Sequence, residues 1–165
     1  MAKSPQKPEV DMSKLRNFSE ADVEAARSGY EVFDKGKPTV SVEELKVFLE
    51  TSGLSIRYPT VFSIIDKITE TNPKGLNFKS FMESFQGFLG NRETKAGAKK
   101  LFEALDIDSK EYLDKDRLSS IAKEIGENIS RSEMDYTIST SFDCSDGKVT
   151  FEAFQRRLLK LKNNS

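Results

Sequence analysis

The chain has 165 residues, 36% of them hydrophobic and 32% charged, and its 26 basic and 27 acidic side chains leave a net charge of −1. This balance is typical of a folded globular protein and excludes a polycationic nucleic-acid-binding protein. Histidine is absent and cysteine occurs once, which excludes imidazole-based catalytic or zinc sites and an internal disulfide. The apolar runs are a few residues long, so we expect no membrane insertion and no secretory signal.

The N-terminal segment, residues 1–17, contains Pro5 and Pro8 and shows no apolar periodicity. Segments of this kind do not bury enough apolar surface to offset the entropy lost on ordering. We therefore expect residues 1–17 to form a disordered extension.

Four amphipathic helices are predicted between residues 18 and 90, each starting at a residue that suits a helix N-terminus. Ser19 and Ser41 each stand three residues before an acid, which is the pattern of a capping box. Pro59 suits the first turn of the third helix, and Asn77 can cap the fourth. Gly53 is predicted to end the second helix.

Residues 91–165 repeat this plan with four more helices, whose apolar faces are predicted within 98–105, 118–125, 134–142 and 151–158. The join between the halves contains Gly87, Gly90 and Gly97. Because glycine costs about 1 kcal/mol per helical position relative to alanine, a rigid continuous helix is disfavoured there. We expect a hinge between a first lobe at 18–90 and a second lobe at 91–165.

A fourfold repeat underlies this plan. Each of four segments contains an apolar helix, a polar gap, one β-branched or leucine residue, and a second apolar helix. The single apolar residues are Val40, Leu76, Leu113 and Val149, at intervals of 36, 37 and 36 residues. A repeat of this length indicates one helix–loop–helix unit used four times, twice in each half.

Four stretches carry a family resemblance: FDKGKPTVSVEEL, GLNFKSF, LDIDSKEYLDKDRL and FDCSDGKVTFEAF. At these spacings they resemble the four EF-hands of the calmodulin, troponin C, centrin and myosin light-chain group. The resemblance implies an all-α fold of four EF-hand-like helix–loop–helix units, paired into two lobes that the glycine-containing hinge joins. It also implies a short β-bridge in each lobe, between Val40 and Leu76 and between Leu113 and Val149.

The third loop, residues 106–117, departs from the calcium motif at key positions. Such a loop needs oxygen ligands at positions 1, 3, 5, 7, 9 and 12, with a bidentate glutamate at position 12. Asp106, Asp108 and Asp114 stand at positions 1, 3 and 9, but Lys110 occupies position 5 and Arg117 position 12. We expect Lys110 to form a salt bridge with Asp106 or Asp108 and so replace the ion. Weak residual calcium binding through the three aspartates is the alternative.

The other three loops lack still more of the ligands. The first, residues 34–44, is only eleven residues long, and the second, residues 69–80, has serine at position 12. The fourth keeps an acid and a glycine at positions 5 and 6 but has phenylalanine, cysteine and alanine at positions 1, 3 and 12. A thiol is a soft ligand that suits calcium poorly. We therefore expect no cofactor and no metal ion, apart from the weak calcium alternative.

The resemblance further implies that each lobe can hold an amphipathic helix of a partner protein. Arg157 is expected at the rim of the second lobe, facing an acid of the partner. The residues that match the family's groove, and that we expect to bind the partner, are Leu49, Ile64, Phe85, Phe154 and Leu158. The competing interpretation of each is permanent burial, since such side chains are more often core than contact.

These observations favour a calcium-independent, calmodulin-like adaptor of the light-chain kind. We expect it to bind an amphipathic helix of a cytoskeletal or motor protein, such as an IQ-like motif, in a cytoplasmic, cytoskeleton-associated location and without contact to nucleic acid. The alternative is a calcium sensor that uses a residual site in the third or fourth loop. An enzyme ranks behind both, because the sequence has no histidine, no nucleotide-binding loop and no motif-linked pair of carboxylates.

Overall fold

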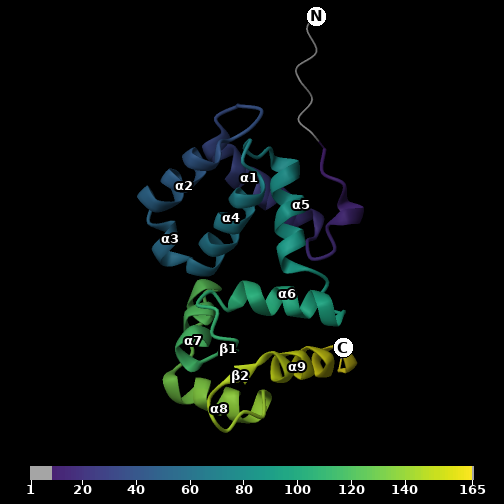
Figure 1. Ribbon diagram of the computed structural model, residues 1–165, viewed down its shortest axis with the longest axis vertical. Helices are drawn as coiled ribbons and strands as arrows, with labels where there is room; N and C mark the ends of the chain where they lie inside the picture. Colours follow the sequence, from purple (N-terminus) through teal and green to yellow (C-terminus); the bar gives the residue numbers. More distant parts are fainter. Residues whose placement is uncertain (1–8, 165) are drawn as a thin grey trace, which may run out of the picture. The chain divides into compact units, whose positions relative to one another are not determined.

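The computed structural model describes residues 9–164, apart from the side chain of Phe33 (Figure 1). Its regular structure is mostly helical, which confirms the all-α prediction. The chain divides into two compact units. Unit 1 comprises the residues up to Arg57 and Val61–Phe88, and unit 2 comprises Tyr58–Thr60 and the residues from Leu89 onward. Within residues 9–164, no helix is long and apolar enough to span a bilayer.

Unit 1 contains two of the four helix–loop–helix units. Its elements are η1 (Met12–Lys14), α1 (Glu20–Asp34), α2 (Val42–Thr51), α3 (Leu54–Arg57), and most of α4 (Pro59–Thr71) and α5 (Phe78–Leu89). Both predicted capping boxes form, at Ser19 and at Ser41. The helix starts predicted at Pro59 and Asn77 are also confirmed: α4 begins at Pro59, and Asn77 Oδ1 accepts a hydrogen bond from the Ser80 backbone N–H at 2.8 Å.

The prediction of disorder is wrong for residues 9–17. Val10 and Leu15 are only 8% and 2% exposed, and the backbone N–H of Asn17 donates to Oε1 of Gln86 at 2.9 Å. Two isolated apolar residues give no periodic signal, so their burial becomes visible only in the tertiary fold. Residues 1–8, which the same prediction covers, lie outside the described residues.

The sequence predicts eight helices, whereas the described residues form nine. The second predicted helix extends to Gly53, but α2 ends at Thr51 and the one-turn helix α3 follows. Gly53 has a φ of +72°, a left-handed conformation that glycine adopts without strain. Four residues are too few to show the apolar period from which a helix is predicted, so α3 carries no sequence signal of its own.

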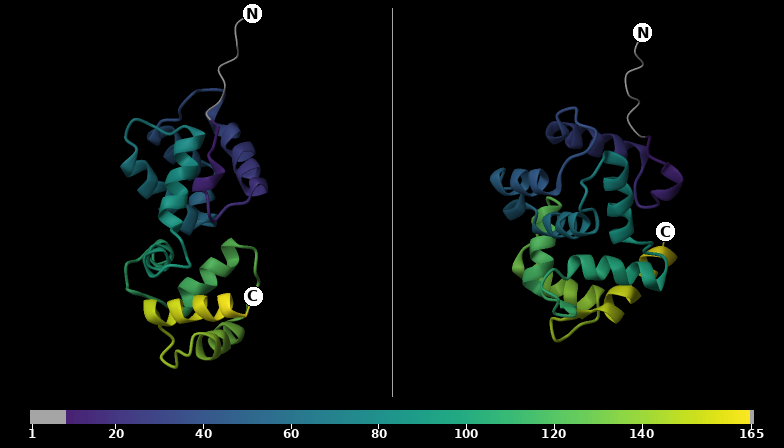
Figure 2. Two further views of the ribbon diagram at one scale, coloured as in Figure 1. Left: turned by 90° about the vertical axis from the view of Figure 1, so that its right-hand side faces the viewer. Right: turned by 45° about the horizontal axis from the view of Figure 1, so that its top comes forward.

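Unit 2 contains the other two helix–loop–helix units. Its elements after the join are α6 (Lys95–Leu105), β1 (Tyr112–Leu113), α7 (Lys115–Glu124), α8 (Arg131–Ser141), β2 (Val149–Thr150) and α9 (Phe151–Asn163). Helix α6 packs against α9, and α7 against α8 (Figure 2). The core between them includes Phe102, Leu113, Ile138, Val149 and Phe154.

An antiparallel β-bridge connects the two loops of each unit, as predicted. In unit 1 the backbone N–H groups of Val40 and Leu76 each donate to the other's carbonyl, at 2.8 and 2.9 Å. In unit 2 Leu113 pairs with Val149 within the β1–β2 ladder. Because these side chains are 2% exposed or less, each bridge also anchors its loops to the core.

The join between the halves is not helical throughout. Helix α5 ends at Leu89 and α6 begins at Lys95, so the predicted break is confirmed. Gly97, however, does not contribute flexibility: it is buried within α6, and a Cβ there would lie 1.8 Å from the carbonyl oxygen of Asn91. Its role is close packing, which corrects its assignment to the hinge. A hinge motion of the two lobes stays a prediction.

Candidate functional site

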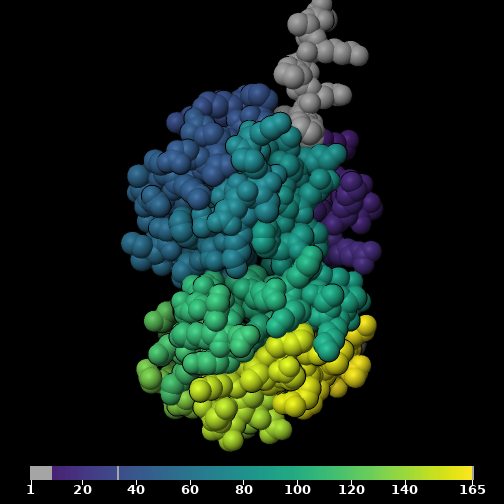
Figure 3. Space-filling view, viewed as in Figure 1, coloured from purple at the N-terminus to yellow at the C-terminus, as the bar shows by residue number. Residues whose placement is uncertain are grey.

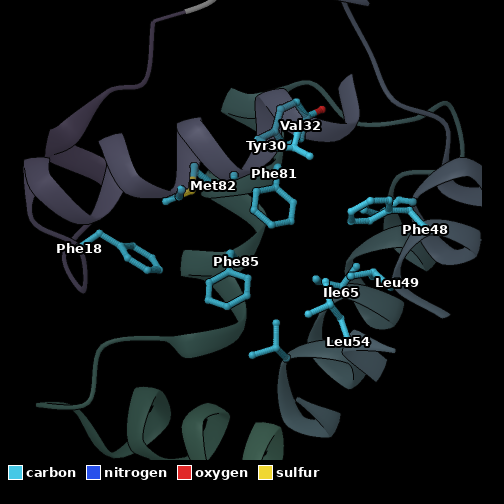
Figure 4. A pocket seen from close by; sticks show the side chains of 14 residues that line it. Phe18, Tyr30, Val32, Phe48, Leu49, Leu54, Ile65, Phe81, Met82 and Phe85 are labelled. Atoms are coloured by element: carbon cyan, nitrogen blue, oxygen red, sulfur yellow. The ribbon is translucent and has the colours of Figure 1, made fainter. Parts of the chain in front are cut away.

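Unit 1 contains an open pocket of about 460 Å³, which we call the groove (Figure 4). Helices α1 to α5 all contribute to its walls, and every lining side chain is apolar except that of Tyr30. The groove therefore presents mostly carbon atoms to whatever enters it. Its lining residues are Phe18, Ala26, Gly29, Tyr30, Val32, Leu45, Phe48, Leu49, Leu54, Val61, Ile65, Phe81, Met82 and Phe85.

Aromatic rings form one connected wall of the groove. The ring centroids of Phe18 and Phe85 are 5.8 Å apart, those of Phe81 and Phe85 6.0 Å, and those of Tyr30 and Phe81 5.8 Å. These separations lie in the range in which aromatic pairs attract each other. In Figure 4 the rings of Phe81 and Phe85 project from α5 into the groove. The mutual contacts fix the rings in place before anything binds.

Tyr30 links this wall to the β-bridge. Its hydroxyl donates to the carbonyl oxygen of Leu76 at 2.6 Å, and the same oxygen accepts the backbone N–H of Val40. Burial, reinforced by the negative charge of Asp34, raises the pKa of Tyr30 to about 12. The phenol therefore stays neutral at physiological pH and keeps its hydrogen bond.

The part of the groove that α1 lines includes two small residues, Ala26 and Gly29. Gly29 lies inside α1, where glycine costs about 1 kcal/mol relative to alanine, and a Cβ at this position would meet no atom within 4 Å. Val32 and Val61, at 66% and 40% exposed, also line the groove. The absence of a side chain at Gly29 therefore leaves open space in an apolar part of the groove, at the usual cost of a glycine within a helix.

The third loop is organised around Lys110. Its Nζ lies 3.1 Å from Asp114 Oδ2 and 3.6 Å from Asp108 Oδ2, so the predicted pairing with Asp108 is confirmed. The predicted alternative, Asp106, is used differently: its two carboxylate oxygens accept the backbone N–H groups of Lys110 and Glu111, at 3.0 and 2.8 Å. The hydrogen bond to Asp114 raises the pKa of Lys110, so the ammonium stays charged.

Position 12 of this loop is held by a buried cation. Asp114 caps α7 by accepting the backbone N–H of Arg117 at 2.8 Å, and this bond together with Lys110 lowers the pKa of Asp114. The Arg117 guanidinium donates through Nε to the Leu105 carbonyl at 2.6 Å and lies 3.5 Å from the Glu124 carboxylate. The side chain at position 12 therefore pairs with a carbonyl and an acid outside the loop.

Comparison with known proteins finds relatives of low sequence identity. No protein-family model matches the chain. It is 25% identical to centrin-3 of Homo sapiens over 142 residues, which are 86% of this chain and 85% of the relative. It is 28% identical to caltractin ICL1e of Paramecium tetraurelia over 118 residues, 71% of this chain and 67% of the relative. It is 22% identical to probable calcium-binding protein CML13 of Oryza sativa subsp. japonica over 133 residues, 80% and 79% of the two chains. These relatives support membership of the EF-hand superfamily.

Some polar groups of the remaining loops also form contacts within the chain. In the first, Lys37 Nζ lies 2.5 Å from Glu44 Oε1, and Glu44 also completes the capping box of α2. In the second, the hydroxyl of the buried Thr69 donates to the Asp66 carbonyl at 2.6 Å. In the fourth, burial raises the pKa of Cys144, so the thiol stays protonated. Across residues 9–164, no three Cys, Asp or Glu side chains converge as metal ligands would.

Two of the three partner-binding residues predicted in the first EF-hand lobe line the groove. Leu49 enters it from α2 and Phe85 from α5. Ile64 is 4% exposed and does not line the groove, whereas the next residue, Ile65, does. Phe81 was not predicted, although it shares the face of α5 with Phe85. A helical period indicates which side chains face inward, but not which of them lie at the edge of the core.

The residues predicted in the second EF-hand lobe are more enclosed. Phe154 is 9% exposed in the core of unit 2, and its ring centroid lies 5.6 Å from that of Phe102. Leu158 packs partly against the same core. Arg157 is half-buried. The structure thus brings together the apolar residues of an open site in unit 1 and places Phe154 among core residues in unit 2.

Proposed function

We propose that this EF-hand protein is a calcium-independent adaptor that binds an amphipathic helix of a partner protein in the groove. The observation that carries the proposal is that the groove of unit 1 is open, apolar and walled by aromatic rings. In the first loop of the same unit, Lys37 already pairs with the carboxylate of Glu44. In EF-hand sensors, calcium converts a closed helix pair into an open one that exposes such a groove. Here Lys37 supplies the cation within the chain, so opening does not depend on an ion.

The chemistry of the groove defines the partner helix. An apolar wall of fixed rings selects anchors at i, i+3 or i+4, and i+7 on one face of a helix. The space beside Gly29 and Ala26 admits one large anchor, such as tryptophan or phenylalanine, close to the backbone of α1. The single polar lining group, the Tyr30 hydroxyl, already donates to Leu76, so the groove favours apolar over polar anchors.

The proposed partner is a cytoskeletal or motor protein with an IQ-like or similar helical motif. The relatives named centrin and caltractin support a non-enzymatic role in a cytoplasmic, cytoskeleton-associated setting. In this proposal unit 2 adds Phe154 and Leu158 as secondary contacts, with Arg157 facing an acid of the partner. Because Phe154 is core in the described structure, its contribution requires unit 2 to open when the partner binds.

A calcium sensor is the second candidate, and one observation favours it. Three aspartates remain in the third loop, and a relative of this chain is named a probable calcium-binding protein. In this reading calcium displaces Lys110 from Asp108 and Asp114. The raised pKa of Lys110 opposes the exchange, because the ammonium remains charged and competes for the same oxygens.

A tryptophan-containing peptide tests the proposal directly. The protein has no tryptophan, so the emission of a designed amphipathic helix with Trp, Leu and Phe at i, i+4 and i+7 reports only on the peptide. When the protein is titrated into the peptide, we expect the tryptophan emission to shift to shorter wavelength and to saturate. The midpoint of this titration should be the same in chelator and in millimolar calcium. Phe81→Ala should weaken binding at least tenfold, while Val47→Ala, on an exposed α2 side chain outside the groove, should not. Binding only with calcium would favour the sensor, and no binding in either condition would refute the groove assignment.

A further inference from the structure

Charge is segregated within unit 2. Residues 91–105 and 151–163, which form α6, the segment before it and α9, contain eight basic and three acidic side chains, a net charge of +5. Residues 106–150, with α7, α8 and both loops, contain six basic and eleven acidic side chains, a net charge of −5. The near-neutral total therefore conceals one strongly basic helix pair.

Local helix stability does not explain the lysines of α6. Lys95, Lys99 and Lys100 lie in the first half of the helix, and its first turn contains no acid. Cations near a helix N-terminus oppose the helix dipole, whereas those in a last turn complement it. Lys160 and Lys162, in the last turn of α9, fit that stabilising role. The three α6 lysines do not, which points to a function outside the helix.

The tertiary structure brings the two basic helices together, and we call the exposed surface of residues 91–105 and 151–163 the α6–α9 face. The two helices pack against each other, and both reach the side of unit 2 seen in Figure 3. Lys99 Nζ lies 5.0 Å above the ring of Phe151 at the start of α9. Of the eight cations, only Lys162 forms a salt bridge with a residue in the described part of the chain, at 3.7 Å from Glu93. The field of this face is therefore only weakly neutralised.

Exposed leucines stand among the cations. Leu159 and Leu161 are 47% and 48% exposed, but residues two apart in a helix point about 200° apart, so they lie on different sides of α9. A concavity of about 370 Å³ is lined by Arg92, Glu93, Leu158, Leu161 and Lys162. Unlike the groove of unit 1, it combines charge with leucine, so it suits an anionic headgroup beside an acyl chain better than the apolar face of a helix.

We propose that the α6–α9 face binds the surface of an anionic lipid bilayer. Basic side chains spread over two helices gain from the negative potential of such a surface, and isolated leucines gain from entering the interface. An acidic protein segment would satisfy the charge but would offer no apolar environment to Leu161, which lines the concavity and is 48% exposed, so the bilayer is favoured. The binding is peripheral, and it is independent of the groove and of the function proposed for it.

Vesicle co-sedimentation of the full chain, in chelator and at low ionic strength, tests this inference. We expect binding to phosphatidylcholine vesicles that contain roughly 30% phosphatidylserine, little binding to phosphatidylcholine alone, and release as salt screens the charges. Each basic residue near an anionic surface contributes about fivefold, so Lys95→Gln/Lys100→Gln should weaken the partition about twentyfold. Leu161→Ala should weaken it severalfold.

Matched controls separate the face from general charge and from the groove. Lys74→Gln/Lys123→Gln removes the same charge at exposed positions outside the face and should change binding less than twofold. Phe85→Ala should leave vesicle binding intact even where it abolishes binding of the groove peptide. Circular dichroism melting shows that each variant is folded.

Several results would overturn the inference. In one case the protein would not sediment with the anionic vesicles at all, and in another it would sediment equally with anionic and neutral vesicles. In a third case the Lys95/Lys100 variant and the Lys74/Lys123 control would lose the same amount of vesicle binding. Binding to soluble polyglutamate without binding to vesicles would assign the face to an acidic protein instead.

Discussion

Replacing Gly29 tests whether the groove is open space or part of a packed core. Gly29 lies inside α1 with a helical backbone, and an added Cβ would find no atom within 4 Å. Alanine there introduces no clash and removes the entropic cost of a helical glycine, about 0.5–1 kcal/mol. For a chain of this length a gain of 1 kcal/mol corresponds to roughly 2–4 °C in Tm. We therefore expect Gly29→Ala to be more stable than the wild type in urea unfolding and thermal melting.

Gly29→Leu extends the same experiment into function. The larger side chain has a helix propensity close to that of alanine and projects into the space that the proposed anchor would occupy. Stability should match or exceed that of the wild type, while affinity for the tryptophan peptide falls at least tenfold, or about 1.4 kcal/mol. Opposite signs for stability and binding are the signature of a binding groove, because filling a packed core lowers stability.

Two outcomes would refute this reasoning. Overpacking a closed core typically costs about 1–3 kcal/mol, so a loss of that size in Gly29→Leu would mean that the groove is closed in solution. Unchanged peptide affinity in a stable Gly29→Leu variant would mean that the helix binds elsewhere. Peptide emission and urea unfolding, measured on the same preparations, distinguish the two.

Three further predictions follow from single contacts. Phe85→Ala should lower the free energy of unfolding by less than roughly 3 kcal/mol, the usual cost of truncating a core phenylalanine, and should weaken peptide binding more than tenfold. A larger loss of stability with unchanged binding would mean that Phe85 is a core residue. Gly97→Ala, unlike Gly29→Ala, should sharply lower Tm, because the alanine Cβ at position 97 would lie 1.8 Å from the Asn91 carbonyl oxygen. A Tm at or above that of the wild type would contradict this close packing. Because burial raises the pKa of Tyr30 to about 12, its contribution to stability is fully present below the ordinary tyrosine pKa of about 10 and is lost as the pH rises through 12. Tyr30→Phe should therefore lose less stability than the wild type between those pH values in urea unfolding, and an equally steep loss would contradict the assignment.

The sequence alone determined the helix–loop–helix plan and the state of the loops. The starts at Ser19 and Ser41 follow from capping contacts that span three residues, and the pairing of Leu113 with Val149 follows from a repeat in which each unit places one apolar residue at the same point. Loop chemistry is equally local, because a lysine at position 5 lies within reach of carboxylates a few residues away.

Features that depend on contacts between distant residues could be determined only from the tertiary structure. Periodicity shows that a side chain faces inward, but Ile64 and Ile65 differ by one residue, and only the packing of the other helices decides which is core and which lines the groove. Val10 and Leu15 are buried although their segment has no pattern. The two basic helices lie side by side only because α6 packs against α9, some 60 positions further along the sequence. Sequence fixes such features only through the global fold, since the free energy of burial and the field of a surface depend on neighbours that the local chain does not contain.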